Sequence, residues 1–233
     1  MLRNIIFSVV FFSGIAFISF IFLPALLLPK IVVLNGGKLM GYWTGLCLKK
    51  IMSVNIKILG KENIITNEKF FVAASHQSMF ETFYLQTIFN SPVFILKKEL
   101  MLIPIFGWYL KKIGSISIKR NKITKDNLSF FYDIKNMINK TERTLIIFPQ
   151  GTRVRSEERP PFKKGAGRIY EELKISCQPV AINSGYVWPK QGSKMANKQI
   201  TISILPKIES GMEKNLFVKN LEEKIYTELN KIN

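Results

Sequence analysis

The sequence predicts an α/β protein with a mixed, largely parallel sheet covered by helices and an N-terminal apolar helical membrane anchor. Two observations predict this fold class. From Val54 onward, short apolar runs typical of buried strands alternate with longer amphipathic runs typical of helices. Before Val54, residues 1–50 consist largely of two apolar stretches. We therefore expect a membrane-anchoring helical segment at residues 1–50 and one α/β domain at residues 51–233.

The N-terminal segment has the length and the charge of a membrane anchor. Its first stretch is uncharged from Ile5 to Pro29, and a helix of that length, rising about 1.5 Å per residue, can cross a hydrocarbon core. The second stretch, Ile31 to Leu48, contains four glycines, which we expect to interrupt it. Residues 1–50 carry five basic residues and no acidic residue, which suits an anionic lipid surface. The pattern disfavours a cleaved signal peptide and leaves open a single span or a hairpin that dips into one leaflet.

The rest of the chain alternates between two kinds of element. Apolar runs bounded by Gly, Pro or Asn predict the strands, and apolar residues at helical spacing predict the helices. The expected strands cover residues 54–59, 70–75, 93–96, 115–118, 144–148, 179–183 and 199–205. The expected helices cover residues 77–89, 100–112, 124–140, 163–173 and 216–232. Such alternation implies helical crossovers between parallel strands.

Charge and cysteine content restrict the kind of partner. The formal net charge of +18 favours an anionic partner, which could be nucleic acid, acidic lipid or a phosphorylated substrate. Cys47 and Cys177 have no metal-binding or redox spacing, so the sequence favours a reducing compartment over a disulfide framework. With a single histidine in the chain, we expect no metal site.

The single histidine, His76, follows the apolar run from Phe70 to Ala74, so the expected strand delivers it to the C-terminal end of the sheet. Histidine suits proton transfer near neutral pH. Glu81 can reach His76 if His76 precedes the first helical turn and the chain curls back. Ser78 then serves as the N-cap and Glu81 completes a capping-box spacing. This pattern predicts a base with an orienting carboxylate, and the alternative is an ordinary histidine before a capped helix.

Basic or polar groups follow other strands as well. Three groups follow expected strands: Lys97-Lys98, Lys119-Arg120 and Gln150-Gly151-Thr152-Arg153. The C-terminal ends of parallel strands share one edge of a sheet, so these groups are expected to converge beside His76. Arg presents a fork suited to phosphate, and Gly151 allows close backbone approach. The pattern predicts a phosphate site, and the alternative for each cluster alone is a solvated surface.

Four ordered motifs in the chain resemble those of the glycerolipid acyltransferase family, and the resemblance covers residues 54–205. Three shorter stretches resemble the bacterial 1-acyl-sn-glycerol-3-phosphate acyltransferase branch. The four motifs are His76-Gln77-Ser78-Met79-Phe80-Glu81, Gly114-Ser115-Ile116-Ser117-Ile118-Lys119-Arg120, Phe148-Pro149-Gln150-Gly151-Thr152-Arg153 and Gln178-Pro179-Val180-Ala181-Ile182. The shorter stretches are Lys97-Lys98-Glu99-Leu100, Pro104-Ile105-Phe106-Gly107-Trp108 and Pro161-Phe162-Lys163-Lys164-Gly165.

Two positions depart from the pattern of the family. Its first motif usually ends in Asp, where this chain has Glu81, and one extra methylene still permits a carboxylate–imidazole hydrogen bond. Its third motif usually has Glu before Gly-Thr-Arg, where this chain has Gln150. An amide keeps hydrogen bonding and loses the charge, so no catalytic carboxylate is expected at residue 150.

The resemblance implies transfer of a fatty acyl group from an acyl thioester to the free sn-2 hydroxyl of 1-acyl-sn-glycerol-3-phosphate, which yields phosphatidic acid. It implies catalytic roles for His76 and Glu81 and substrate-binding roles for a second set of residues. That set is Lys97, Arg120, Gly151, Thr152 and Arg153.

No bound cofactor or metal is expected, and acyl-coenzyme A or acyl-[acyl carrier protein] is the expected co-substrate. The sequence does not identify the oxyanion donors, and the backbone amides after His76 are candidates. The expected partners are lysophosphatidic acid, an anionic phospholipid surface and the acyl carrier, and the expected location is the cytoplasmic side of a bacterial inner membrane. Alternatives are a different lysophospholipid or lyso-aminolipid acceptor, a nucleic-acid-binding protein and an inactive membrane-associated homologue.

Overall fold

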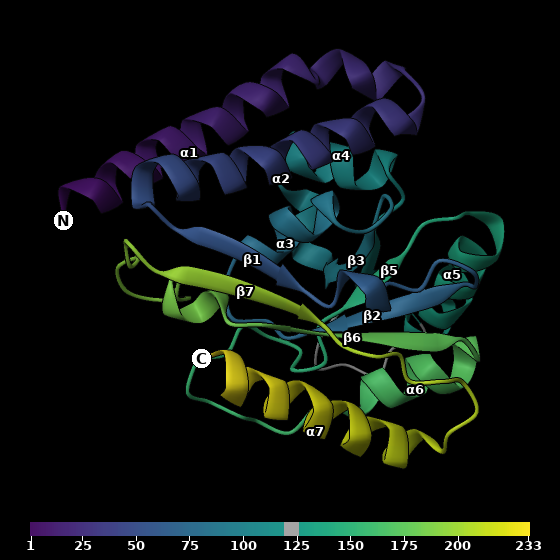
Figure 1. Cartoon of the computed structure of the whole chain (residues 1–233). Coiled ribbons are helices and arrows are strands. Elements are labelled where there is room, and N and C mark those ends of the chain that lie inside the picture. The colour runs from purple at the N-terminus through teal and green to yellow at the C-terminus, as the bar shows by residue number, and fades with distance from the viewer. Residues whose placement is uncertain (119–125) are drawn as a thin grey trace.

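The computed structural model describes residues 1–118 and 126–233, with the backbone alone for residues 126–129. The described residues form a mixed sheet of seven strands in the order β1-β7-β6-β2-β5-β3-β4 (Figure 1). The strands are β1 (Asn55–Leu59), β2 (Phe70–Ala74), β3 (Val93–Lys97), β4 (Ile116–Ile118), β5 (Leu145–Ile147), β6 (Ser176–Ile182) and β7 (Gln199–Ile204). The helices are α1 (Leu2–Ile21), α2 (Lys30–Met52), α3 (Phe80–Tyr84), α4 (Phe106–Lys112), α5 (Asp126–Lys140), α6 (Lys164–Leu173) and α7 (Lys214–Ile232). This architecture confirms the predicted fold class.

Five neighbouring strands point the same way. β6, β2, β5, β3 and β4 are mutually parallel, whereas β7 runs antiparallel to β6 and carries β1 parallel to itself at the sheet edge. The C-terminal ends of β6, β2, β5, β3 and β4 therefore lie along one edge of the sheet, as the sequence predicted for the last four.

Alternation along each strand divides the apolar residues between two cores. In β2, Phe71 and Ala73 face the core formed with α5, α6 and α7, whereas Val72 and Ala74 face the core formed with α1, α2 and α3. Both faces of the sheet are thus covered, which explains why the central strands read as continuous apolar runs. Figure 1 shows α1 and α2 on one side of the sheet and α6 and α7 on the other.

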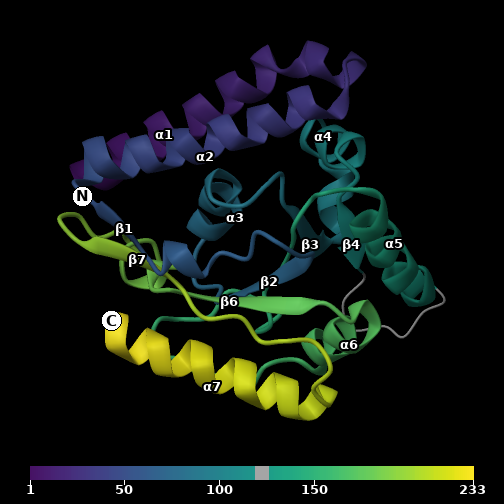
Figure 2. The same ribbon diagram turned by 45° about the vertical axis from the view of Figure 1, so that its right-hand side comes forward.

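The N-terminal segment folds into a helical hairpin. α1 and α2 are joined by the short 3₁₀ helix η1 (Leu23–Leu27) and lie side by side (Figure 2). The four glycines of α2 do not interrupt it, in contrast to the expectation from sequence. They allow close packing instead: a Cβ on Gly41 would lie 2.6 Å from the carbonyl oxygen of Phe83 in α3. Glycine in a helix costs about 1 kcal/mol relative to alanine, and this helix-to-helix contact offsets it.

Two expected helices are shorter than their sequence patterns. Residues 77–79 form a loop, so α3 begins at Phe80 and continues as the 3₁₀ helix η3 (Leu85–Thr87). The apolar stretch around Pro104 divides into the 3₁₀ helix η4 (Lys98–Leu102) and α4. Pro104 cannot donate a backbone hydrogen bond inside a helix, and Ile105 after it has a positive φ of 63°.

Candidate active site

His76 and Glu81 meet at the sheet edge where the parallel strands end. His76 follows the central strand β2, and Glu81 lies in the first turn of α3. The imidazole Nδ1 of His76 lies 3.2 Å from Oε2 of Glu81. The chain thus curls back between them, as the capping-box spacing required. A carboxylate accepts at Nδ1, so the Nδ1–H tautomer is favoured and Nε2 keeps a free lone pair. The His76 side chain is 14% exposed, so the ring has access to solvent.

Glu81 is fully buried and its two oxygens are held by several donors. The backbone N–H of Ser78 donates to both oxygens, at 3.2 and 3.0 Å, and the N–H of Gln77 donates to Oε1 at 3.3 Å. The hydroxyl of Ser184, which follows β6, donates to the same Oε1. A buried carboxylate is stable only with such partners, and here the partners also fix its orientation.

Ser78 lies one residue before the N-cap of α3, which is Met79, so the expectation that Ser78 is the N-cap is wrong by one position. Its Oγ accepts a hydrogen bond from the N–H of Phe80 at 3.0 Å while its own N–H donates to Glu81. These two bonds satisfy backbone donors in the turn before α3 and at its first residue. Glu81 therefore holds the turn before α3 and contacts His76 with the same carboxylate.

Three of the candidate oxyanion donors, the backbone N–H groups after His76, are already engaged in hydrogen bonds within the protein. The N–H groups of Gln77 and Ser78 donate to Glu81, and that of Phe80 donates to Ser78. A donor engaged with a buried carboxylate is not available to a developing oxyanion.

The loop after β5 holds the main chain and the ring of His76. Oε1 of Gln150 accepts the His76 N–H at 3.0 Å, and the N–H of Val154 donates to the His76 carbonyl at 2.9 Å. The ring of Phe148 stacks on the imidazole with centroids 4.0 Å apart. Gln150 is buried and carries no charge, and it acts here through its amide oxygen.

The same loop presents the candidate phosphate-binding residues. Gly151 has a φ of +74°, a region that glycine occupies without strain, and its N–H closes a turn onto the Phe148 carbonyl at 2.9 Å. Thr152 is exposed and Arg153 is half-buried. Among the described residues, the guanidinium group of Arg153 has no hydrogen-bond or ion-pair partner. Arg153 directly precedes Val154, whose N–H bonds to His76, so the main chain at Arg153 lies next to that of His76.

Of the other two candidate phosphate-binding residues, Lys97 and Arg120, the structure describes Lys97. Lys97 ends β3, two strands from β2 across β5, and its side chain is exposed. Arg120 lies outside the described residues. The sheet edge therefore brings together His76, Glu81 and the loop 150–153, with Lys97 farther along the same edge.

The roles of two residues of this site could not be predicted from the sequence. Ser184 lies 103 residues from Glu81, and only the pairing of β6 with β2 brings them together. Phe148 ends the expected strand 144–148, and its stacking on His76 depends on the alignment of β5 with β2. No grouping of three or more His, Cys, Asp or Glu side chains suited to a metal occurs in the described part of the chain.

A histidine oriented by a buried carboxylate at the C-terminal edge of an α/β sheet defines a site for general base catalysis. The family model described as Acyltransferase matches residues 55–183, which include every residue of the site except Ser184. The chain therefore belongs to the acyltransferase family.

Several curated relatives are similar to this chain, and each is named 1-acyl-sn-glycerol-3-phosphate acyltransferase. The Helicobacter pylori protein is 36% identical over 141 residues, which cover 59% of this chain and 57% of that protein. The Pseudomonas aeruginosa protein is 30% identical over 142 residues, covering 61% and 54% respectively. The Saccharomyces cerevisiae protein is 31% identical over 150 residues, covering 62% and 49%. The chain thus spans about half the length of the curated relatives it matches.

One solved structure shares the fold over the whole chain. The 1-acyl-sn-glycerophosphate (LPA) acyltransferase from Thermotoga maritima has a TM-score of 0.72 to this chain, with 19% sequence identity, and the alignment covers 100% of this chain and 98% of that one. The N-terminal hairpin therefore belongs to the shared fold.

Proposed function

We propose that this chain transfers a fatty acyl group from an acyl thioester to the sn-2 hydroxyl of 1-acyl-sn-glycerol-3-phosphate and so forms phosphatidic acid. The observation that carries the proposal is the His76–Glu81 pair, held at 3.2 Å beside the loop that presents Arg153. The names of the curated relatives support the same reaction.

In the proposed reaction, Nε2 of His76 takes the proton from the sn-2 hydroxyl as the hydroxyl oxygen attacks the thioester carbonyl carbon. The new C–O ester bond forms, the C–S bond breaks, and the proton passes from His76 to the leaving thiolate. Glu81 keeps the imidazole in the Nδ1–H tautomer and stabilises the imidazolium between the two proton transfers. No acyl-enzyme is needed, since the thioester is already activated.

The phosphate of the acceptor is assigned to Arg153, with Gly151 and Thr152 shaping the loop and Lys97 and Arg120 adding positive charge. Arg153 is suited to this role because its guanidinium group has no partner among the described residues and can form a bidentate pair with phosphate. The acyl donor is acyl-coenzyme A or acyl-[acyl carrier protein], and an assay with both donors identifies it.

We place the protein on one leaflet of a membrane, held by the α1–α2 hairpin. α1 is a helix of 20 residues with a mean hydropathy of 2.2, and it is the one helix of the described chain long and apolar enough to cross a bilayer. Both of its ends are tied to the rest of the protein, however. The guanidinium of Arg3 bonds Oγ of Ser53 at 2.9 Å, and the hydroxyl of Tyr109 bonds the Ser19 carbonyl at 2.5 Å. A helix fixed along the body at both ends suits a membrane surface better than a span.

For the cellular location, we propose the cytoplasmic side of a bacterial inner membrane. The cysteines are free and buried, which suits a reducing compartment.

The test of the proposed function is a competition between acceptors. Purified full-length protein receives an acyl thioester with equal amounts of lysophosphatidic acid, lysophosphatidylcholine and monoacylglycerol, and the products are separated by chromatography. We expect phosphatidic acid to be the main product. Faster acylation of either other acceptor would contradict the proposed substrate.

A further inference from the structure

The segment between β3 and α4 exposes a run of apolar side chains. Leu102 is 79% exposed and Trp108 is 53% exposed, and the apolar residues between them include Ile103, Ile105 and Phe106, all exposed. We call these five residues the η4–α4 surface. Soluble monomers seldom expose so many large apolar side chains together, and such a surface indicates an interaction site.

The backbone of this segment holds those side chains in place. Ile105 has φ 63° and ψ −58°, and the N–H of Phe106 bonds the Pro104 carbonyl at 2.6 Å, which is a γ-turn with positive φ. Gly107 packs under the turn, because a Cβ there would lie 2.2 Å from the carbonyl oxygen of Met101. Strain of this kind persists only where its surroundings enforce it, so the exposure of Ile105 and its neighbours is built into the fold.

The η4–α4 surface adjoins the tip of the N-terminal hairpin. α4 contacts α2 and η1, and the Tyr109 hydroxyl bonds the Ser19 carbonyl. Figure 2 shows α4 beside the turn of the hairpin. That turn exposes apolar side chains of its own, at Leu27, Leu28 and Ile31. Two exposed apolar surfaces from distant parts of the sequence therefore lie side by side.

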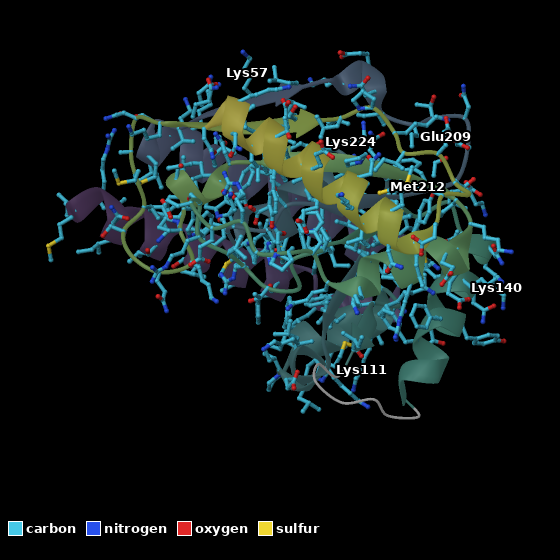
Figure 3. All side chains as sticks on the ribbon, turned by 90° about the horizontal axis from the view of Figure 1, so that it is seen from below. Lys57, Lys111, Lys140, Glu209, Met212 and Lys224 are labelled. Atoms are coloured by element: carbon cyan, nitrogen blue, oxygen red, sulfur yellow. The ribbon has the colours of Figure 1, made fainter. Side chains whose placement is uncertain are left out.

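The charges around the η4–α4 surface are mostly positive. Residues 97–112 contain four lysines, at 97, 98, 111 and 112, and one acidic residue, Glu99. Lys111 lies at the opposite side of the molecule from Lys57 of the β1 edge (Figure 3). An apolar centre that includes a tryptophan, bordered by lysines, is the composition of a surface that meets anionic headgroups.

We propose that the η4–α4 surface inserts into the headgroup region of an anionic bilayer and forms a second membrane contact, separate from the hairpin. The inference rests on the proposed function, because a lipid acceptor has to reach the active site from the membrane. η4 begins directly after Lys97 at the end of β3, so docking brings the C-terminal edge of the sheet toward the membrane.

A position-specific label tests the contact. Both native cysteines are buried, so a new cysteine on the surface is the reactive thiol of the described chain. Full-length Leu102→Cys carries an environment-sensitive nitrobenzoxadiazole label, and Leu216→Cys on α7 is the matched control, since Leu216 is also an exposed leucine, at 56%. α7 lies on the other face of the sheet (Figure 1). With phosphatidylglycerol vesicles, we expect a blue shift and quenching by brominated lipid at residue 102 and neither change at residue 216.

Several outcomes of the labelling experiment would overturn the proposed membrane contact. A label at residue 102 that stays in water while the protein floats with the vesicles would leave the hairpin as the membrane contact and overturn the inference. So would failure of the protein to bind vesicles, or equal binding to neutral phosphatidylcholine vesicles. A blue shift without vesicles that grows with protein concentration would assign the surface to a second copy of the chain.

Vesicle binding and turnover by a double variant test the membrane contact independently of the label. The double variant Leu102→Glu/Trp108→Glu should lower affinity for anionic vesicles about tenfold or more, because both side chains lose apolar burial. Its turnover of vesicle-borne acceptor should fall with it, while turnover in detergent micelles and vesicle binding by Leu216→Glu stay near wild type. Equal loss in vesicles and micelles would overturn the inference. Label insertion without any acylation would contradict the proposed function and leave the membrane contact intact.

Discussion

Ser184 and Glu81 lie 103 residues apart in the chain and are joined by a buried hydrogen bond from the serine hydroxyl to Oε1 of the carboxylate. Oε2 of the same carboxylate faces Nδ1 of His76 at 3.2 Å. The Glu81 carboxylate therefore connects Ser184, after the end of β6, to His76, after the end of β2. Glu81 is one methylene longer than the aspartate usual in the family, and Ser184 holds the oxygen that does not face the imidazole.

Ser184→Ala should lower kcat about 3- to 10-fold with little change in KM. A hydrogen bond to a charged group is worth about 1.5–3 kcal/mol, and only part of that loss reaches the transition state. Ser184→Thr keeps a hydroxyl and should retain more activity. Ser203 is the matched control, since its buried hydroxyl bonds Glu228 at 2.7 Å away from the site. Ser203→Ala should alter thermal stability and leave kcat unchanged; an unaltered kcat in Ser184→Ala would remove Ser184 from the positioning of Glu81.

Glu81→Gln should lose most of its activity, about 10²-fold or more, whereas Glu81→Asp should retain a substantial part. The amide removes the charge that stabilises the imidazolium and turns a donor toward the N–H of Ser78. Steady-state kinetics of both variants, with circular dichroism to verify folding, makes the comparison. A folded and fully active Glu81→Gln variant would leave Glu81 as a helix-capping residue alone.

Arg153→Ala should lower kcat/KM for lysophosphatidic acid about 10- to 100-fold, as expected from the loss of charge-assisted bonds to phosphate. Arg153→Lys should restore only part of the loss, since a point charge does not reproduce the guanidinium fork. Monoacylglycerol, which lacks the phosphate, is the control acceptor and should be scarcely affected. An equal loss with both acceptors would move the phosphate assignment to Arg120 or Lys97.

Replacing the exposed phenylalanines of α1 should weaken membrane binding without unfolding the protein. Phe12, Phe17 and Phe20 are exposed, so their replacement by serine removes apolar contact with lipid alone. Phe7 and Phe11 are fully buried against Trp188 and serve as the contrast, because truncation of either to alanine should cost about 3–5 kcal/mol of stability. Flotation with vesicles and thermal unfolding separate the two effects.

The same burial changes how the anchor is best tested. Deletion of residues 1–48 would remove Phe7, Phe11 and Leu48 from the core and expose α3, so loss of folding would be confounded with loss of membrane binding. If the triple serine variant stays on membranes with unchanged affinity, the hairpin is not the anchor.

The strands and the edge at which they end could be predicted from local patterns, because apolar runs and the polar groups after them are contiguous in sequence. The approach of Glu81 to His76 followed from a capping-box spacing. The partners that depend on sheet order could not be predicted. Ser184 reaches Glu81 only because β6 pairs with β2, and Phe148 reaches His76 only because β5 lies on the other side of β2.

The continuity of α2 could not be predicted either. The glycines of α2 read as interruptions, whereas the helix packs closely against α3 and accepts them as contact positions, as Gly41 shows. In both cases, a tertiary contact decided what a local pattern left open.

The most direct test is the rate of phosphatidic acid formation by wild type and His76→Ala. Purified full-length protein receives lysophosphatidic acid with acyl-coenzyme A or with acyl-[acyl carrier protein], and circular dichroism verifies that the variant is folded. Wild type should form phosphatidic acid with at least one donor, and His76→Ala should be slower by about 10²–10⁴-fold, the usual contribution of a general base. A wild type without turnover on either donor, or a His76→Ala variant as fast as wild type, would contradict the proposed reaction and its base.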